Sequence, residues 1–420
     1  MAAPSKLDEV EMQLFFRPHD LKVIQSDKTS PYSAPQDWED LFDYELYSDL
    51  HQKLIDNNFE KPSSIQASSI NIANGEDHPS ILGQAQNGSG KTLAFVVNSL
   101  LRVDRNLDKV QVVILVPTNL LADQTEEYFE KLAPEGVTYT KFVKNGFEID
   151  HLGQIVISSP GLLFNTAKKV PQLNDVDVFI VDECDEIIMG DLYHEDLLNY
   201  ASKIQKAQFL LYSATLVNEL NDFINRFKPN IQKIILPQKN VINRTNKHFY
   251  VDCRKGMNKV DAISIMFQYL FQFQSFIFFN TKNYLNKVQR QLEAQKLECD
   301  WCSSERTKEE RSEVVKKFRN QEIKVLLSTN LLARGIDIPS CKVVINFDMP
   351  RKGKPPTIPD YESYLHRQGR CGRFGKEGKV FNLVKDDKDM EMIEYIRKTY
   401  SVEITEINPQ DVQKFAEKNK

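Results

Sequence analysis

The sequence predicts an α/β protein of two domains, each a parallel β-sheet wrapped by helices. Strand-length apolar runs alternate with helical patterns along the chain, the order that parallel sheets with crossover helices require. A chain of 420 residues exceeds what one core usually organises, so two domains of about 200 residues each are expected. Hydrophobic residues make up 41% and aromatic residues 10%, which is typical of packed globular domains and excludes wholesale disorder.

Nine apolar runs are the predicted strands. The first domain contains ILGQA, QVVILVP, QIVISSP, DVFIVD and QFLLYSA, at residues 81–85, 111–117, 154–160, 177–182 and 208–214. The second contains SFIFFNT, KVLLST, KVVINF and VFNLV, at residues 275–281, 324–329, 342–347 and 380–384. Polar residues end most of these runs, and ligands of open α/β sheets bind at the carboxyl ends of strands. The sequence therefore predicts a polar rim on both domains, able to hold one nucleotide between them.

The stretch LPQKNVINRTNKHF, at residues 236–249, separates the two sets of strands and is interpreted as a linker. We therefore expect a first domain at residues 36–237 and a second at residues 238–420, after an N-terminal extension, residues 1–35, with at most one helix. The longest apolar runs are far below the roughly 18 residues of a membrane span. Because the N-terminus lacks the pattern of a secretory signal, we expect a nuclear or cytosolic protein.

Cysteine spacing and charge give weaker indications. Six cysteines are scattered over the chain and are expected to be reduced thiols. Cys299 and Cys302 form a C-x-x-C, but no second ligand pair lies at zinc-binding spacing, so we interpret it as incidental. The net charge of −5 divides into +10 for residues 238–420 and −15 for the residues before them. This asymmetry is compatible with a nucleic-acid partner and equally with solvated surface charge.

The stretch ILGQAQNGSGKTLAF has the pattern of a phosphate-binding loop, with a glycine-rich turn between an apolar run and a helix. Gly88, Ser89 and Gly90 would direct backbone N–H groups toward phosphates. Lys91 would pair with the β- and γ-phosphates, and Thr92 would hold Mg²⁺. The sequence therefore predicts a nucleoside-triphosphate site.

Such a loop occurs in kinases, GTPases and helicase-like motors, so the rest of the chain must distinguish them. Two GTPase-like patterns, DHLGQ at residues 150–154 and NKVD at residues 258–261, lie in the wrong context. No apolar strand precedes the first, and the second lies beyond the linker, where it opens a helix. A kinase would leave the second half of the chain without a role.

The second half instead places arginines among glycines, in LLARGIDIP at residues 331–339 and YLHRQGRCGRFG at residues 364–375. Guanidinium groups held in this way are suited to the charge that develops on a transferring phosphoryl group. The arginines are Arg334, Arg367, Arg370 and Arg373.

From about residue 36 to the C-terminus the chain resembles the DEAD-box RNA helicases, whose motifs appear in order. The first domain contains FEKPSSIQ (Q motif), AQNGSGKT (I), PTNLLA (Ia), SSPG (Ib), VDECD (II) and SAT (III). The second contains FIFFNT (IV), STNLLARGID (V) and HRQGRCGR (VI). The resemblance implies two tandem RecA-like domains, ATP and Mg²⁺ as cofactors, and an RNA-dependent ATPase that locally remodels RNA–protein complexes.

Within this family the chain most resembles the subfamily of mRNA export at the cytoplasmic face of the nuclear pore. The resemblance includes KVIQSDKTSPYSAPQDWEDL before the Q motif, the loop FDMPRKGKPPTIPDYESYLHR and the ending YIRKTYSVEITEINPQDVQKFAE. It implies a location at the pore and, beside single-stranded RNA and mRNA–protein particles, a nucleoporin and an inositol-hexakisphosphate-bound activator as partners. A monomer is expected. Cys184 in VDECD instead resembles the DECD-box helicase of splicing and export, which ranks second because its motif VI differs.

The resemblance assigns roles around the nucleotide in the first domain. Gln66 would read the adenine edge, with Phe59 nearby and Trp38 offering a stacking face. Asp182 would hold Mg²⁺ through water, and Glu183 would orient and deprotonate the attacking water.

In the second domain, Asp337 would contact the ribose. Arg370 and Arg373 would act as arginine fingers that arrive when the domains close, a contribution of about 10³ to 10⁵ in rate. Catalysis is therefore expected to require both domains.

The same resemblance assigns RNA-binding and coupling residues. RNA would be contacted through its backbone by Gly146, Ser159, Gly161, Arg311 and Thr329, which implies little sequence preference. The coupling residues are Asp185, Ser213, Thr215, Arg334, His366 and Arg367. Among them, Ser213 and Thr215 would link Asp185 to His366.

The chain departs from the family at several RNA-contact positions. Asn119 and Leu120 replace the usual Arg-Glu of motif Ia, and Leu162 replaces the usual arginine after motif Ib. In the second domain Lys308 stands for glutamine while Arg311 is retained. These departures leave open a slow-turnover, ATP-dependent RNA clamp as the alternative to an active motor.

Overall fold

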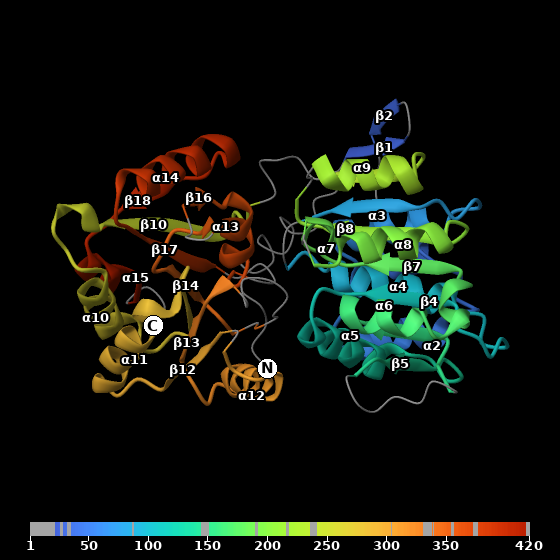
Figure 1. Ribbon diagram of the computed structural model, residues 1–420, viewed down its shortest axis with the longest axis horizontal. Coiled ribbons are helices and arrows are strands. Elements are labelled where there is room, and N and C mark those ends of the chain that lie inside the picture. Colours follow the sequence, from blue (N-terminus) through green and yellow to red (C-terminus); the bar gives the residue numbers. More distant parts are fainter. Residues whose placement is uncertain are drawn as a thin grey trace. The chain divides into compact units, whose positions relative to one another are not determined.

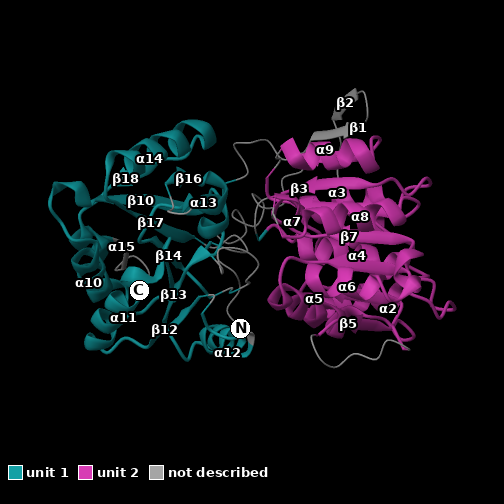
Figure 2. Cartoon of the chain, in the orientation of Figure 1, with its two compact units in different colours: residues 1–14, 86–88, 238–420 teal, residues 15–85, 89–237 magenta. Residues whose placement is uncertain are grey.

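The computed structural model describes residues 22–25, 28–31, 35–85, 88–143, 151–189, 192–215, 218–235, 242–303, 305–330, 338, 340–353, 357–372 and 377–416. The chain divides into two compact units (Figure 2). Residues 15–85 and 89–237 make up the first unit described below, and residues 238–420 make up most of the second.

The first unit contains a nine-stranded sheet in the order β2-β1-β9-β3-β8-β7-β4-β6-β5 (Figure 1). Seven of these strands are parallel, and the β1–β2 hairpin is added antiparallel to β9. The strands are β1 (Lys22–Gln25), β2 (Lys28–Pro31), β3 (Ile81–Gln84), β4 (Val112–Leu115), β5 (Tyr139–Lys141), β6 (Ile155–Ser158), β7 (Val178–Val181), β8 (Gln208–Ser213) and β9 (Gln232–Ile235).

Helices cover both faces of this sheet. They are η2 (Trp38–Asp40), α2 (Ser48–Asp56), α3 (Ser64–Ala73), α4 (Lys91–Arg102), α5 (Asn119–Leu132), α6 (Pro160–Ala167), η3 (Pro171–Asn174), α7 (Cys184–Met189), α8 (His194–Lys203) and α9 (Asn218–Phe227). Alternate residues of one strand enter different cores: Ile114 packs with α2 to α5, and Val113 packs with α6 to α9. The central strands are therefore continuous apolar runs, as expected for a parallel sheet buried on both faces.

The second unit contains a seven-stranded parallel sheet in the order β12-β13-β11-β14-β17-β10-β18. Its strands are β10 (Asn246–Asp252), β11 (Ser275–Phe278), β12 (Cys299–Cys302), β13 (Val325–Ser328), β14 (Val343–Asn346), β17 (Gly378–Val384) and β18 (Ile404–Glu406). A separate two-stranded ribbon pairs β15 (Arg351–Lys352) with β16 (Ile358–Pro359).

Two cores again lie on the two faces of the sheet. The helices of the second unit are η5 (Cys253–Lys255), α10 (Lys259–Leu270), η6 (Lys282–Tyr284), α11 (Leu285–Ala294), α12 (Lys308–Arg319), α13 (Tyr361–Gln368), α14 (Asp387–Tyr400), η8 (Pro409–Val412) and α15 (Gln413–Ala416). On β10, Phe249 packs on the side of α10 and α11, whereas Tyr250 packs on the side of α13 and α14.

All nine predicted strands are present, as β3, β4, β6, β7, β8, β11, β13, β14 and β17. Two predictions need correction. The stretch interpreted as a linker extends too far, because its last residues, from Asn246, already form β10. The N-terminal extension contains the β1–β2 hairpin, which the sequence did not predict.

None of the six cysteines is in a disulfide bond. Cys299 and Cys302 lie three residues apart on β12, where an odd separation directs the two side chains to opposite faces of the strand. This spacing cannot form a chelating pair without leaving the strand conformation. In the part of the chain that the structure describes, no helix has the length and apolarity to cross a membrane.

Candidate functional site

The loop between β3 and α4 has the backbone of a phosphate-binding turn. Gly88 and Gly90 have φ angles of 77° and 95°, in the left-handed region that glycine adopts most readily. A Cβ atom on Gly90 would lie 2.2 Å from Nε2 of Gln66. Space and backbone conformation therefore both require glycine at this position, while Gln86 and Asn87 lie outside the described residues.

Lys91 and Thr92 open α4 directly after this turn. The amino end of a helix carries unpaired N–H groups and partial positive charge, which favour a bound phosphate. Lys91 is 6% exposed, and its Nζ donates a hydrogen bond to the carbonyl of Ala85 at 2.8 Å. The side chain of Lys91 thus connects the end of the loop to Ala85 at its beginning.

Two side chains of the Q motif form hydrogen bonds with the backbone of this loop. Ser63 Oγ donates to the carbonyl of Ser89 at 2.8 Å, and Gln66 Nε2 donates to the carbonyl of Gly90 at 3.1 Å. Gln66 Oε1 in turn accepts from the backbone N–H of Ser63 at 2.7 Å. Ser63 was not among the predicted site residues, although the S-x-x-Q spacing of a helix capping box is visible in the sequence. The amide of Gln66 is placed against the phosphate loop, and its contact with adenine stays a prediction.

Trp38 does not offer the stacking face that the sequence predicted. Its side chain is 1% exposed and lies in the core of the first unit. Its Nε1–H donates to the carbonyl of Phe59 at 2.7 Å. The indole therefore holds the first residue of the Q motif from the buried side. Phe59 is half-buried, with its ring stacked on Tyr128 at a centroid separation of 6.1 Å.

The acidic pair follows β7, at the carboxyl edge of the sheet that β3 and the phosphate loop share. Asp182 Oδ1 accepts from the backbone N–H of Glu183 at 2.9 Å. The pKa of Asp182 is raised to about 7, mainly by burial and also by the neighbouring Glu183, while Lys91 acts against both. Glu183 has a φ of 45°, an uncommon conformation that a non-glycine residue retains where its surroundings enforce it.

This set of donors fits a magnesium ion. The buried carboxylate of Asp182 is a hard oxygen ligand, and the hydroxyl of Thr92 is the second one that the loop pattern supplies. Oε2 of Glu183 is buried and has no hydrogen-bond partner among the described residues. A bound cation would favour the ionised form of Asp182, opposing the effect of burial.

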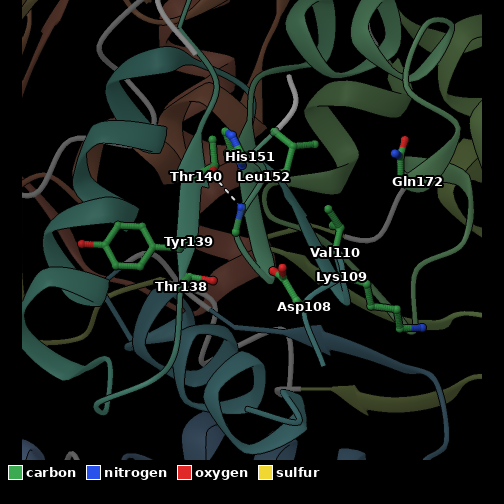
Figure 3. A pocket seen from close by; sticks show the side chains of 10 residues that line it. Asp108, Lys109, Val110, Thr138, Tyr139, Thr140, His151, Leu152 and Gln172 are labelled. Carbon is green, nitrogen blue, oxygen red and sulfur yellow. Dashed lines mark hydrogen bonds between the residues drawn. The ribbon is translucent and has the colours of Figure 1, made fainter. Parts of the chain in front are cut away.

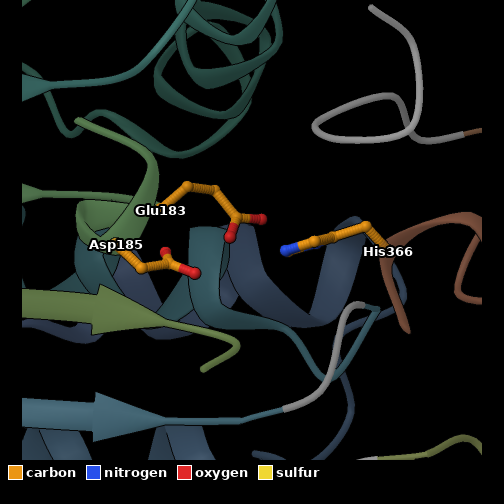
Figure 4. A group of neighbouring side chains, drawn as sticks. All are labelled: Glu183, Asp185 and His366. Carbon is orange, nitrogen blue, oxygen red and sulfur yellow. The ribbon is translucent and has the colours of Figure 1, made fainter. Parts of the chain in front are cut away.

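Motifs II and III are joined within the first unit. Thr215 Oγ1 donates to Asp185 Oδ2 at 2.6 Å, and Ser213 Oγ donates to the carbonyl of Thr215 at 2.6 Å. Figure 4 draws Asp185 and Glu183 beside the start of α7, and His366 on α13 of the second unit. The predicted link between Asp185 and Thr215 is present, and its continuation to His366 stays a prediction.

Motifs Ia and Ib meet at the ends of β4 and β6, which are neighbouring strands. Ser159 precedes α6, and its Oγ donates to Asn119 Oδ1 at 2.6 Å. A Cβ atom on Gly161 would lie 2.9 Å from the hydroxyl of Tyr193, so a larger residue there would have to displace that hydroxyl. Gly146 lies outside the described residues.

The predicted residues of the second unit lie on different elements. Arg311 is on α12, and Thr329 follows β13, where its N–H donates to the carbonyl of Cys302 at 3.4 Å. Arg370 follows α13, is 2% exposed and donates from Nε to the carbonyl of His366 at 3.2 Å. Arg334, Asp337 and Arg373 lie outside the described residues.

A pocket of about 370 Å³ lies at the opposite edge of the first sheet (Figure 3). Most of its lining lies at or just before the first residues of β4, β5 and β6, and includes Asp108, Lys109, Thr138 and His151. Because the phosphate loop and the acidic pair lie at the carboxyl ends of the strands, this pocket is separate from the candidate nucleotide site.

The two parallel sheets and the phosphate loop with its acidic pair define a two-domain, nucleotide-driven motor. The sequence matches the DEAD/DEAH box helicase family over residues 63–223 and the helicase conserved C-terminal domain over residues 258–375. The chain belongs to the DEAD-box family of ATP-dependent RNA helicases.

Known relatives cover almost the whole chain. DEAD-box ATP-dependent RNA helicase 38 of Arabidopsis thaliana is 33% identical over 404 residues, which are 92% of this chain and 80% of the relative. The structure is similar to S. cerevisiae Dbp5 bound to RNA and ADP BeF3, with a TM-score of 0.84, 27% identity and coverage of 91% and 99% of the two chains. It is also similar to a Dbp5 variant bound to Nup159, a Gle1 variant, IP6 and ADP, with a TM-score of 0.66, 26% identity and coverage of 88% and 98%. The predicted fold of two tandem RecA-like domains is confirmed.

Replacing Trp38 by alanine is expected to lower the free energy of unfolding of the first unit by about 3–5 kcal/mol, because it empties a buried site the size of an indole. Urea denaturation followed by circular dichroism measures this change. Tyr44→Ala is the matched control, since Tyr44 is 50% exposed in the same unit and its loss should change stability by less than about 0.5 kcal/mol. If Trp38→Ala keeps its stability but loses affinity for ATP, the structural role is contradicted and stacking of Trp38 on the adenine is supported.

Proposed function

We propose that the chain is an RNA-stimulated ATPase that locally remodels RNA–protein complexes, with its ATP-binding domain at residues 36–237 and its helicase C-terminal domain at residues 238–420. The observation that carries this proposal is the complete hydrolytic set of the first unit. Lys91, Asp182 and Glu183 are buried at the carboxyl edge of one sheet, beside a loop whose backbone requires glycine.

ATP phosphates would bind the N–H groups at the amino end of α4 and the ammonium group of Lys91. To reach the β- and γ-phosphates, Lys91 must exchange its hydrogen bond with the carbonyl of Ala85 for one with the nucleotide. Asp182 and Thr92 would hold Mg²⁺, which neutralises phosphate charge when bound. Glu183 would orient the attacking water and accept its proton.

Coupling between ATP and RNA would proceed through motif III. The hydroxyl of Thr215 is already bonded to Asp185, which follows the acidic pair by two residues. The remaining coupling set is His366, Arg334 and Arg367. From the second domain, Asp337 would contact the ribose, and Arg370 and Arg373 would act as arginine fingers. Closure on both ligands would bring these groups together, and opening after hydrolysis would release the RNA.

RNA would be held through its backbone, which implies little sequence preference. The proposed contacts are Gly146, Ser159, Gly161, Arg311 and Thr329. Support comes from the position of Ser159 and Thr329, each of which directly follows a strand at the carboxyl edge of its own sheet.

We place this activity in mRNA export at the nuclear pore. The extended loop before motif VI carries the subfamily resemblance, and similarity to Dbp5 in complexes with Nup159, Gle1 and IP6 supports the same partner classes for this chain. A nucleoporin and an inositol-hexakisphosphate-bound activator are therefore the proposed partners. Dbp5 similarity also favours this placement over the DECD-box alternative that Cys184 suggested.

Glu183→Gln is expected to lower the RNA-stimulated ATPase rate by about 10² or more, because the amide cannot accept a proton from water. Steady-state turnover with and without single-stranded RNA measures the effect. Glu195→Gln, an exposed substitution on α8, is the matched control and should leave turnover unchanged.

The same assay separates the motor from the clamp. RNA stimulation that disappears in Glu183→Gln supports the motor. ATP binding without RNA-dependent turnover in the unsubstituted protein would contradict it and favour the slow RNA clamp.

Asn119→Arg is expected to tighten RNA binding roughly tenfold and to steepen the dependence of log affinity on log salt by about 0.7, the value for one added phosphate contact on a single strand. The reason is that Asn119 occupies a position where the family carries arginine and its amide already contacts Ser159. Asn106→Arg adds the same charge in an exposed loop before β4, at the other end of the strands. Equal affinities and slopes for the two variants would show that Asn119 does not face RNA.

A further inference from the structure

Arg367 lies on α13, is 0% exposed and is surrounded by neutral hydrogen-bond acceptors. Its Nε donates to Asn330 Oδ1 at 2.9 Å, and its Nη2 donates to Asn280 Oδ1 at 3.1 Å. Its Nη1 donates to Asn346 Oδ1 at 3.1 Å and to the carbonyl of Asp348 at 2.7 Å. We call these four acceptors the Arg367 cage.

The cage joins the carboxyl ends of three neighbouring strands. Asn280 follows β11, Asn330 follows β13, and Asn346 is the last residue of β14. These strands are adjacent in the order β13-β11-β14. Asn330 also follows Thr329 directly in the chain, so the guanidinium fixes the backbone next to a proposed RNA contact.

Further contacts orient the amides of the cage, so that their oxygens face the guanidinium. Asn346 Nδ2 donates to Asn382 Oδ1 at 2.8 Å, and Asn280 Nδ2 donates to the carbonyl of Met349 at 2.8 Å. With their N–H groups engaged elsewhere, both amides present only acceptors to Arg367.

The charge of Arg367 is left without a carboxylate partner among the described residues. Asp348 contributes its carbonyl to the cage, while its carboxylate accepts from Lys259 Nζ at 3.4 Å and from the N–H of Asn280 at 3.1 Å. Burial lowers the pKa of Arg367 to about 9, while Asp348 and Asp360 act in the opposite direction. The group therefore remains a cation at neutral pH.

An aspartate differs from an asparagine by one terminal group and would form the stronger, charge-assisted pair with arginine. The chain uses asparagine at all three side-chain positions of the cage. The neutral oxygens of the cage thus accept hydrogen bonds from the guanidinium and do not cancel its positive charge. In a low-dielectric interior such a charge acts over a longer range than it would in water.

We propose that Arg367 is a positioning residue for RNA, whose caged charge, bonded directly to no carboxylate of the described residues, attracts the phosphate backbone to Thr329 without contacting it. The proposal rests on the RNA-binding function proposed above. Such a charge would offset the lack of arginine at Asn119 and Leu162, two positions that carry arginine in the family.

The test is to cancel the charge while keeping the shape of the cage. Asn330→Asp and Asn346→Asp each place a carboxylate against the guanidinium, and Asn286→Asp places the same charge on an exposed position of α11. Binding of a uridine homopolymer to the full chain is measured over a salt series with a non-hydrolysable ATP analogue present.

Each cage variant is expected to bind about tenfold more weakly, because the added carboxylate cancels most of the guanidinium's long-range attraction for phosphate. The dependence of log affinity on log salt should become shallower, by less than the 0.7 or so of a direct phosphate contact. Asn286→Asp should match the unsubstituted protein in both quantities. Thermal unfolding should occur at the same or a higher temperature in the cage variants, because each gains an ion pair.

Three outcomes would overturn the proposal. One is equal affinity and slope for all variants, and another is weaker binding with an unchanged slope, which would assign the cage a geometric role alone. Failure of the unsubstituted protein to bind the homopolymer would refute the proposed function as well. Binding by the unsubstituted protein with no change in the cage variants would refute only the role of Arg367.

Discussion

The structure depends on one constraint, the burial of both faces of each parallel sheet. Since apolar side chains from the helices occupy those faces, polar groups have room only where the strands end. The phosphate loop after β3, the acidic pair after β7 and Ser213 at the end of β8 all occupy such positions in the first unit. Thr329 and the Arg367 cage occupy them in the second. One packing rule thus sets where chemistry can occur in both halves of the chain.

The same rule determines which strands the sequence could predict. Central strands are buried on both faces, so β4 and β14 appear as uninterrupted apolar runs. Strand β5 is half-buried throughout, and β18 has one buried residue of three, so neither shows such a run. Strand β10 begins with Asn246, Lys247 and His248, and two of these polar residues are buried by contacts with distant elements, which local sequence does not encode.

Site residues divide in the same manner. Lys91, Asp182 and Glu183 could be predicted because each belongs to a short motif whose geometry is set by one strand and the following turn. The burial of Trp38 depends on a hydrogen bond to Phe59, 21 residues away. The cage of Arg367 brings together residues up to 87 positions apart. Such long-range contacts follow from the topology of the sheet. The sequence therefore indicated that Trp38 and Arg367 are site residues but did not indicate which groups they bond to.

The bonds from Ser63 and Gln66 to the carbonyls of Ser89 and Gly90 join a helix that precedes β3 to the loop that follows it. The two elements cannot move independently without breaking buried polar contacts, which are costly to leave unmade. Any substitution of Gln66 would therefore also disturb the loop that follows β3. The side chain predicted to select the base is thus part of the frame that holds the predicted phosphate site in shape.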